Sequence, residues 1–266
     1  MYGAKKFFAA SMLPPTPTYV SNPAGYKIIS SENTPVTGVF GSREPVKTRR
    51  VALHDFAKNA LKRTSKTKTK YTNKRDKLFF NFDDGFVYGD CSSLVEAMLA
   101  VVAPNALSEV RAHAGLATGK RLLAAHFAEF FSGIGLPLNQ PRYWAQISDF
   151  RDASRGDVLA VKYLQTDGKK TSGHVMILDG PPLTTLATGI VEGLTGGFGR
   201  PTSTPFTVTF KVIHEAGKEG TGPGFSRKTK MAKLNRFGEI VSIKNSTKLM
   251  DPYKKYELIA IGRLRN

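Results

Sequence analysis

The hydrophobic periodicity of this chain changes type part-way along, and that change limits the fold more than any other feature. In residues 91–103 the apolar side chains recur at helical spacing, at positions 94, 95, 98, 99 and 102, and Pro104 follows. Such a stripe predicts an amphipathic helix. The same spacing predicts two further helices, a short one at 51–62 and another at 120–132.

From residue 157 onward, β-branched and aromatic residues form the short runs that are typical of strands. The predicted strands cover residues 157–163, 174–178, 206–214, 239–243 and 256–264. The first two are expected to pair antiparallel across a turn at residues 166–169. Helices followed by strands predict an α+β domain, with N-terminal helices packed on a mostly antiparallel sheet.

The segments outside this pattern differ in composition. Residues 1–50 are rich in Pro, Ser, Thr and Gly and predict an extended basic leader, which leaves residues 51–266 as a single domain. Within that domain, residues 63–77 are rich in Lys and Thr and predict a solvated arm. Residues 181–205 are rich in Gly and Thr and predict an inserted loop.

The charge is strongly positive, at a formal +18, and predicts a polyanionic partner. Residues 43–77 carry a net +10 and residues 211–266 a net +8, whereas residues 78–210 carry a net −2. The charge therefore lies on the margins of an ordinary core and suits targeting to an anionic wall or membrane surface. Nucleic acid remains an alternative partner.

The chain has one cysteine, Cys91, which excludes a disulfide scaffold and a Cys-cluster metal site. It lies at the start of the helix predicted at 91–103, in the sequence Tyr88-Gly-Asp90-Cys91-Ser92. Backbone N–H groups and the helix dipole at this position stabilise a thiolate and can hold an oxyanion. Asp90 is the expected N-cap, and Tyr88 and Ser92 are expected to support the site.

A thiol nucleophile needs a base, and His174 is the first candidate because it begins an apolar strand. A third polar group should orient that imidazole, and His214 is the best placed. Strand alternation puts His214 on one face with Phe210 and Val212, and Glu215 on the other. No metal site is predicted, because the cysteine and the two histidines lack the paired local spacing of zinc ligands.

Three blocks of sequence resemble the NlpC/P60 family of papain-like cysteine peptidases and amidases. They are Asp90–Val95 (DCSSLV), Arg155–Leu159 (RGDVL) and Gly173–Ile177 (GHVMI), and the similarity spans roughly residues 78–243. The resemblance implies a papain-like fold with the nucleophile at a helix start. It also implies roles for Cys91 as nucleophile, His174 as general base and acid, and His214 as the orienting residue.

The family pattern has two departures here. The tyrosine that the family carries about a dozen residues before the cysteine is replaced by imperfect counterparts, of which Tyr88 is one. The stretch between His174 and His214 is longer than is usual, so Glu215 and Asp179 remain alternatives for the third position.

The resemblance implies an enzyme without a cofactor that cleaves amide bonds, above all in peptidoglycan stem peptides. The sequence is also compatible with two alternative functions. One is a papain-like deamidase or acyltransferase effector that acts on a protein or lipid in a target cell, and the other is a non-catalytic polyanion-binding protein. If the peptidoglycan hydrolase is delivered to other cells as a toxin, an immunity protein is an expected partner.

No signal peptide is recognised, and no run approaches the ~20 apolar residues of a transmembrane helix. We therefore expect synthesis in the cytoplasm, followed by export through a specialised secretion system or delivery to a target cell wall or periplasm.

Overall fold

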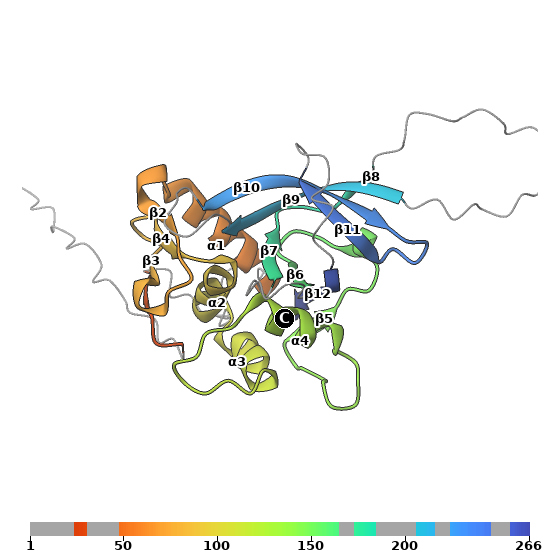
Figure 1. Ribbon diagram of the computed structural model, residues 1–266, viewed down its shortest axis with the longest axis horizontal. Coiled ribbons are helices and arrows are strands. Elements are labelled where there is room, and N and C mark those ends of the chain that lie inside the picture. Colours follow the sequence, from red (N-terminus) through yellow and green to blue (C-terminus); the bar gives the residue numbers. More distant parts are fainter. Residues whose placement is uncertain (1–23, 31–47, 165–172, 185–205, 216–223, 246–255) are drawn as a thin grey trace, which may run out of the picture.

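The computed structural model describes residues 24–30, 48–164, 173–184, 206–215, 224–245 and 256–266. Most of the predicted leader, the turn at 166–169 and most of the predicted loop at 181–205 lie outside these residues. Figure 1 shows helices α2, α3 and α4 gathered beside a large curved sheet, with a smaller sheet at one end of the molecule.

Four α-helices are described: α1 (Arg49–Arg63), α2 (Cys91–Val102), α3 (Pro104–His113) and α4 (Ala124–Ser132). The predictions of α1 and α2 are confirmed within three residues at each end. Helix α4 begins four residues later than predicted, and α3 was missed. Pro104 ends α2 but also occupies the first turn of α3, where its missing N–H costs nothing.

The large sheet is antiparallel throughout and has the order β11-β10-β9-β7-β6-β12-β5, with β8 paired to β9. Its strands are β5 (Trp144–Gln146), β6 (Val158–Tyr163), β7 (Gly173–Leu178), β8 (Leu183–Thr184), β9 (Phe206–Glu215), β10 (Phe225–Leu234), β11 (Ile240–Asn245) and β12 (Tyr256–Leu264). All five predicted strands are present, and the antiparallel pairing of β6 with β7 is confirmed. The sequence missed β5, β8 and β10.

The two faces of the large sheet bury two different apolar clusters. Val175 and Ile177 of β7 pack in the cluster that contains the helices, which we call the helix-side core. Met176 and Leu178 pack in the cluster on the opposite face, which we call the far-side core. The alternation along β7 therefore shows which way each of its side chains points.

A second sheet has the order β1-β3-β4-β2 and consists of β1 (Lys27–Ile29), β3 (Phe79–Asn81), β4 (Phe86–Gly89) and β2 (Thr69–Tyr71). The β1–β3 and β2–β4 pairs are parallel, so the sheet joins segments that are far apart in the sequence. Its inner face buries Ile28, Phe80 and Val87 in the helix-side core.

This small sheet corrects two predictions. Residues 63–77 are largely exposed, as a solvated arm would be, but they are folded into the sheet: they contain two short 3₁₀ helices, η1 (Lys66–Lys68) and η2 (Arg75–Lys77), and strand β2, in which Thr69 is buried. Residues 24–30 of the predicted leader likewise belong to the core, because Ala24 and Ile28 are buried there. Strands of three residues are too short to produce a periodic signal in the sequence.

Among the described helices, none combines the length and the apolar character that crossing a bilayer requires.

Candidate functional site around Cys91

Cys91 is the first residue of α2, and Asp90 is the N-cap, as predicted. The Asp90 carboxylate accepts hydrogen bonds from the Ser93 backbone N–H at 2.9 Å and from the Ser92 hydroxyl at 3.1 Å. The Ser93 hydroxyl accepts in return from the Asp90 N–H at 2.8 Å, which completes a capping box. Arg121 forms an ion pair with Asp90. Cys91 is thus held at a firmly capped helix start.

The thiol of Cys91 is buried, with 7% of the residue exposed. Burial, and then the nearby charge of Asp90, raise its pKa to about 12, against the opposing effects of Arg121 and of hydrogen bonds from the backbone of Val175 and Ser92. We expected the helix start to lower the pKa of Cys91, but the sum of the effects raises it. Desolvation and an acidic N-cap outweigh the helix terminus, so the resting side chain is a protonated thiol.

His174 and His214 meet on the large sheet. Nε2 of His174 lies 2.7 Å from Nδ1 of His214, and the two rings are nearly perpendicular, at 87°. His214 is 4% exposed, and its burial, with smaller effects of Lys230 and Lys228, lowers its pKa to about 3. His214 is therefore neutral at any ordinary pH and can accept a hydrogen bond from Nε2–H of His174 through Nδ1.

The two imidazoles lie on the far side of the sheet from α2. His174 is the cross-strand partner of Val161, which packs in the far-side core. His214 lies two residues after Val212 on β9, and Val212 packs in the far-side core, so His214 points to the same face. Cys91, in contrast, packs in the helix-side core.

The thiol nevertheless lies close to the strand that carries His174, since the backbone N–H of Val175, the next residue, is near enough to lower the thiol pKa. Strands β7 and β9 pair at Ile177 with Ile213 and at Leu178 with Val212, so their ladder ends before it reaches His174 and Val175. Among the described residues, the structure brings His174 and His214 into a hydrogen bond and sets Cys91 against the peptide that follows His174. It records no hydrogen bond from the thiol to either ring.

Glu215 lies on the same side of the sheet as Cys91. Its cross-strand partner is Phe225, which packs in the helix-side core, so Glu215 points away from the face of His214, as alternation predicted. The residue is fully buried, and neither carboxyl oxygen has a hydrogen-bond partner within the described part of the chain. Burial and the charge of Asp90 raise its pKa to about 9, so Glu215 is a neutral acid at pH 7.

Tyr71, the last residue of β2, is a member of this region that the sequence did not reveal. Burial, followed by the charges of Cys91 and Asp90, raises the pKa of its phenol. Tyr71 belongs to the segment interpreted as a solvated arm, and only the parallel pairing of β2 with β4 brings it here. No local pattern in the sequence could have indicated that pairing.

Two other predicted residues lie elsewhere. Tyr88 is half-buried on the outer face of the small sheet, against the rings of Phe79 and Phe86, so it does not support Cys91. Asp179 accepts a hydrogen bond from Nε2 of His54 at 2.9 Å and pairs with Arg227 at 2.7 Å. It ties α1 to β10 and is not the partner of His174.

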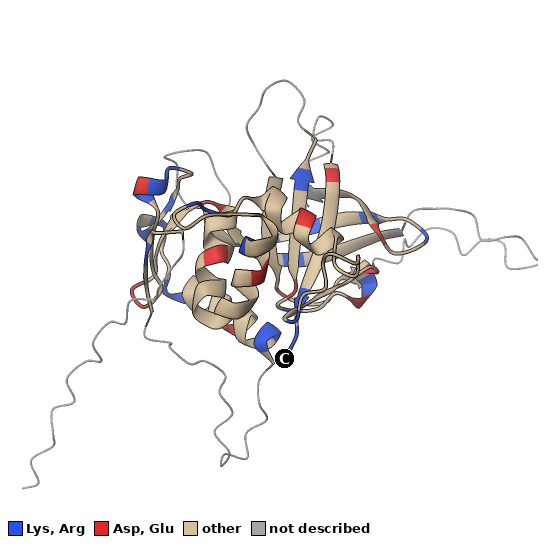
Figure 2. Cartoon of the chain, turned by 90° about the horizontal axis from the view of Figure 1, so that it is seen from below, with Lys and Arg blue, Asp and Glu red and all other residues tan. Residues whose placement is uncertain are grey.

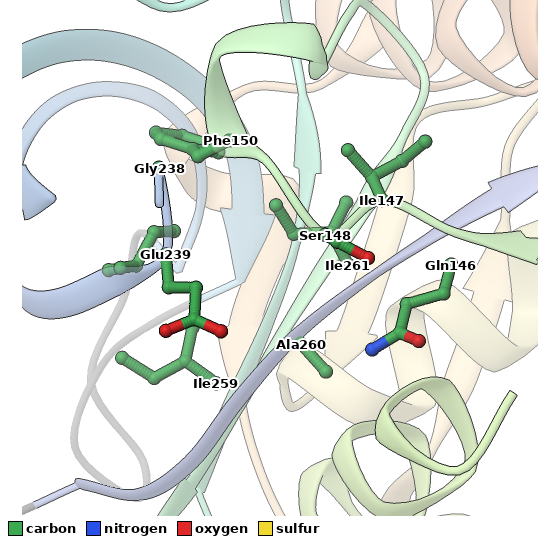
Figure 3. Close-up of a pocket in the computed structure, with 10 residues that line it drawn as sticks. Gln146, Ile147, Ser148, Phe150, Gly238, Glu239, Ile259, Ala260 and Ile261 are labelled. Atoms are coloured by element: carbon green, nitrogen blue, oxygen red, sulfur yellow. The ribbon is translucent and has the colours of Figure 1, made fainter. Parts of the chain in front are cut away.

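A cavity of about 270 Å³ lies at a different place, between β5, β12 and the β10–β11 hairpin. Figure 3 shows Ser148, Phe150, Glu239 and Ile261 among its lining residues. None of the predicted site residues lines it.

Within the described ranges, no three His, Cys, Asp or Glu side chains are grouped so as to hold a metal ion. Comparison of the chain with protein-family models, with curated proteins and with solved structures gave no match.

Proposed function

We propose that this protein is a cysteine hydrolase that cleaves amide bonds, with Cys91 as nucleophile, His174 as general base and acid, and His214 as the residue that orients His174. The observation that carries the proposal is the 2.7 Å contact between Nε2 of His174 and Nδ1 of His214, because His174 lies on β7, whose Val175 N–H is near enough to the thiol to lower its pKa. A histidine held by a third group, on the strand that packs against the helix of the nucleophile, supplies the parts that nucleophilic catalysis needs.

The protonation states are consistent with these roles. In the proposed tautomer, Nε2–H of His174 donates to Nδ1 of the neutral His214, and Nδ1 of His174 is the nitrogen that takes a proton. The resting thiol carries its proton, so proton transfer to His174 has to accompany the attack by sulfur.

In the proposed reaction, the His174 ring approaches the thiol around the open end of the β7–β9 ladder, and the sulfur of Cys91 adds to the substrate carbonyl as its proton passes to Nδ1 of His174. The backbone N–H of Cys91, free at the helix start, donates to the oxyanion. His174 then gives its proton to the leaving amine as the C–N bond breaks and a thioester forms. Water attacks the thioester, losing a proton to His174, and the departing sulfur takes that proton back.

For the substrate we propose peptidoglycan stem peptides. The support is the NlpC/P60-like sequence of the Cys91, Asp157 and His174 blocks, together with basic margins suited to an anionic wall. Membership of that family is part of the proposal, as are the papain-like fold, an immunity protein as partner and delivery to a target cell wall.

The test is digestion of purified peptidoglycan, with new amine termini identified by mass spectrometry. Cys91→Ala and His174→Ala should each abolish hydrolysis, with losses on the order of 10³-fold or more. His113→Ala is the matched control, because His113 is an exposed histidine outside this region. It should keep full activity.

Wild-type protein that releases no amine termini from wall material, or a Cys91→Ala variant with undiminished hydrolysis, would overturn the proposal. Release of ammonia from protein glutamine, without new amine termini, would favour the deamidase alternative.

A further inference from the structure

The outer face of the small sheet carries one row of side chains across all four strands. Lys27 is the cross-strand partner of Phe79, Phe79 of Tyr88, and Tyr88 of Lys70. Cross-strand partners share a face, so two lysines flank two aromatic rings in a single line. With strands about 4.8 Å apart, the row spans roughly 14 Å.

A third ring widens this row into a cluster. Phe86 lies 6.4 Å from Phe79 and 6.2 Å from Tyr88, measured between ring centroids, and Phe79 lies 6.1 Å from Tyr88. All three residues are only half-buried, in contrast to Phe80 on the inner face, which is fully buried. The ammonium group of Lys68 lies 5.2 Å from the centroid of Phe86. Three partly exposed rings grouped on one face of a sheet offer an apolar surface to a ligand.

The surroundings are strongly basic. Residues 62–77, which lead into and out of β2, contain eight Lys and Arg and one Asp. Figure 2 shows several stretches of the ribbon in the blue of Lys and Arg at this end of the molecule. The acidic residues of the adjoining β3–β4 turn are engaged by other groups: Asp83 faces Arg63 at 4.0 Å, and Asp84 accepts from Asn81 at 2.7 Å.

We propose that this face, formed by Phe79, Phe86 and Tyr88 with Lys27, Lys68 and Lys70, binds single-stranded nucleic acid. Aromatic rings on a sheet stack on unpaired bases, and flanking lysines contact the phosphates. A duplex is disfavoured because its bases are stacked on one another and the face offers no helix to enter a groove. A neutral glycan could stack on the rings but would gain nothing from the lysines.

The proposed binding face is separate from the Cys91 region, since it lies on the outer side of the sheet while Tyr71 reaches Cys91 from β2. The proposal therefore does not depend on the hydrolase activity. Cys91→Ala should bind nucleic acid as the wild type does, so that failure of one proposal leaves the other intact.

The test is fluorescence anisotropy of the full chain with labelled oligothymidylate, repeated over a range of NaCl concentrations. Phe79→Ala should weaken binding roughly tenfold through lost base stacking. Phe79→Leu keeps the apolar contact area but not the aromatic face, and should weaken binding almost as much. Lys70→Ala should lower the slope of log K against log salt by about 0.7.

The matched controls lie outside the small sheet, on β9 and in the turn between β10 and β11. Phe237 is 61% exposed and lies under Arg236, so Phe237→Leu removes an aromatic ring beside a cation. Lys211→Ala removes an exposed charge. Neither should change affinity, and circular dichroism should show each variant folded.

Equal losses in Phe79→Leu and Phe237→Leu would overturn the proposal. Equal affinity for duplex and for oligothymidylate would also overturn it. So would tight binding of heparin that is unchanged in the Phe79 variants. Either result would mean that the surface binds by charge alone.

Discussion

Replacing Glu215 by Gln should stabilise this protein at pH 7 and above, and by more as the pH rises. Glu215 is fully buried with both carboxyl oxygens unpartnered, and burial raises its pKa from 4.5 to about 9. Between these two values the folded protein holds a proton that the unfolded chain releases. The wild type therefore loses stability as the pH rises from about 4.5 to about 9.

The size of the effect follows from the two pKa values. Each unit of pH in that interval costs about 1.4 kcal/mol, so the loss due to Glu215 is on the order of 3 kcal/mol at pH 7. Gln has nearly the same shape and does not ionise, so Glu215→Gln removes this loss. Its added amide N–H is itself buried without a known partner, which subtracts a constant of about 1–3 kcal/mol at every pH.

The assay is urea unfolding of both proteins between about pH 5 and pH 8.5. The difference in the free energy of unfolding between variant and wild type should increase steadily with pH. Protonation of His214, whose depressed pKa destabilises the fold below about pH 6.5, occurs in both proteins and cancels in the difference. Glu239→Gln, at an exposed carboxylate, supplies the control.

A difference that stays constant over this range would refute the reasoning. It would mean that Glu215 ionises at an ordinary pH, with water or another group supplying the missing hydrogen bonds.

Two further predictions concern the surroundings of Cys91 and His174. Asp90→Asn keeps an N-cap but removes the charge that raises the thiol pKa, so iodoacetamide should alkylate Cys91 faster at pH 8, by about tenfold for each unit the pKa falls. Asp149→Asn, another N-cap paired with an arginine, should leave the rate unchanged, and an equal or slower rate in Asp90→Asn would contradict the electrostatic account. Gly173→Ala should destabilise the β6–β7 pairing, because φ is +147° at Gly173 and an added Cβ would lie 1.8 Å from the Val161 carbonyl oxygen. Thermal unfolding should show a lower Tm, whereas Gly180→Ala, where the added Cβ meets nothing within 4 Å, should not.

The sequence predicted those parts of the fold whose signal is local. Helix α2 has five apolar residues at helical spacing and an acidic N-cap, and both its start and its end were found. Strands β6, β7, β9 and β12 have enough β-branched residues to be recognised one at a time. Strand β10 was missed because four Lys and Arg interrupt its apolar residues and one of them, Lys230, is itself buried.

The candidate site divides in the same way. The contact between His174 and His214 was predicted from their positions on two strands, and the structure brings these residues together. The buried neutral acid of Glu215 and the approach of Tyr71 were not predicted. Both depend on desolvation and on strand pairing between distant segments, neither of which a local pattern encodes.

The position of β12 has a consequence for how the chain is made. β12 (Tyr256–Leu264) lies between β6 and β5, inside the large sheet, although both of its neighbours are synthesised about a hundred residues earlier. Until residues 256–264 leave the ribosome, β6 has only β7 beside it and presents an open edge to the solvent. Open edges of this kind pair with other chains. Translation therefore passes through a stage in which a chaperone that shields β6 would raise the yield of folded protein, and slow translation of the last third of the chain would lower it.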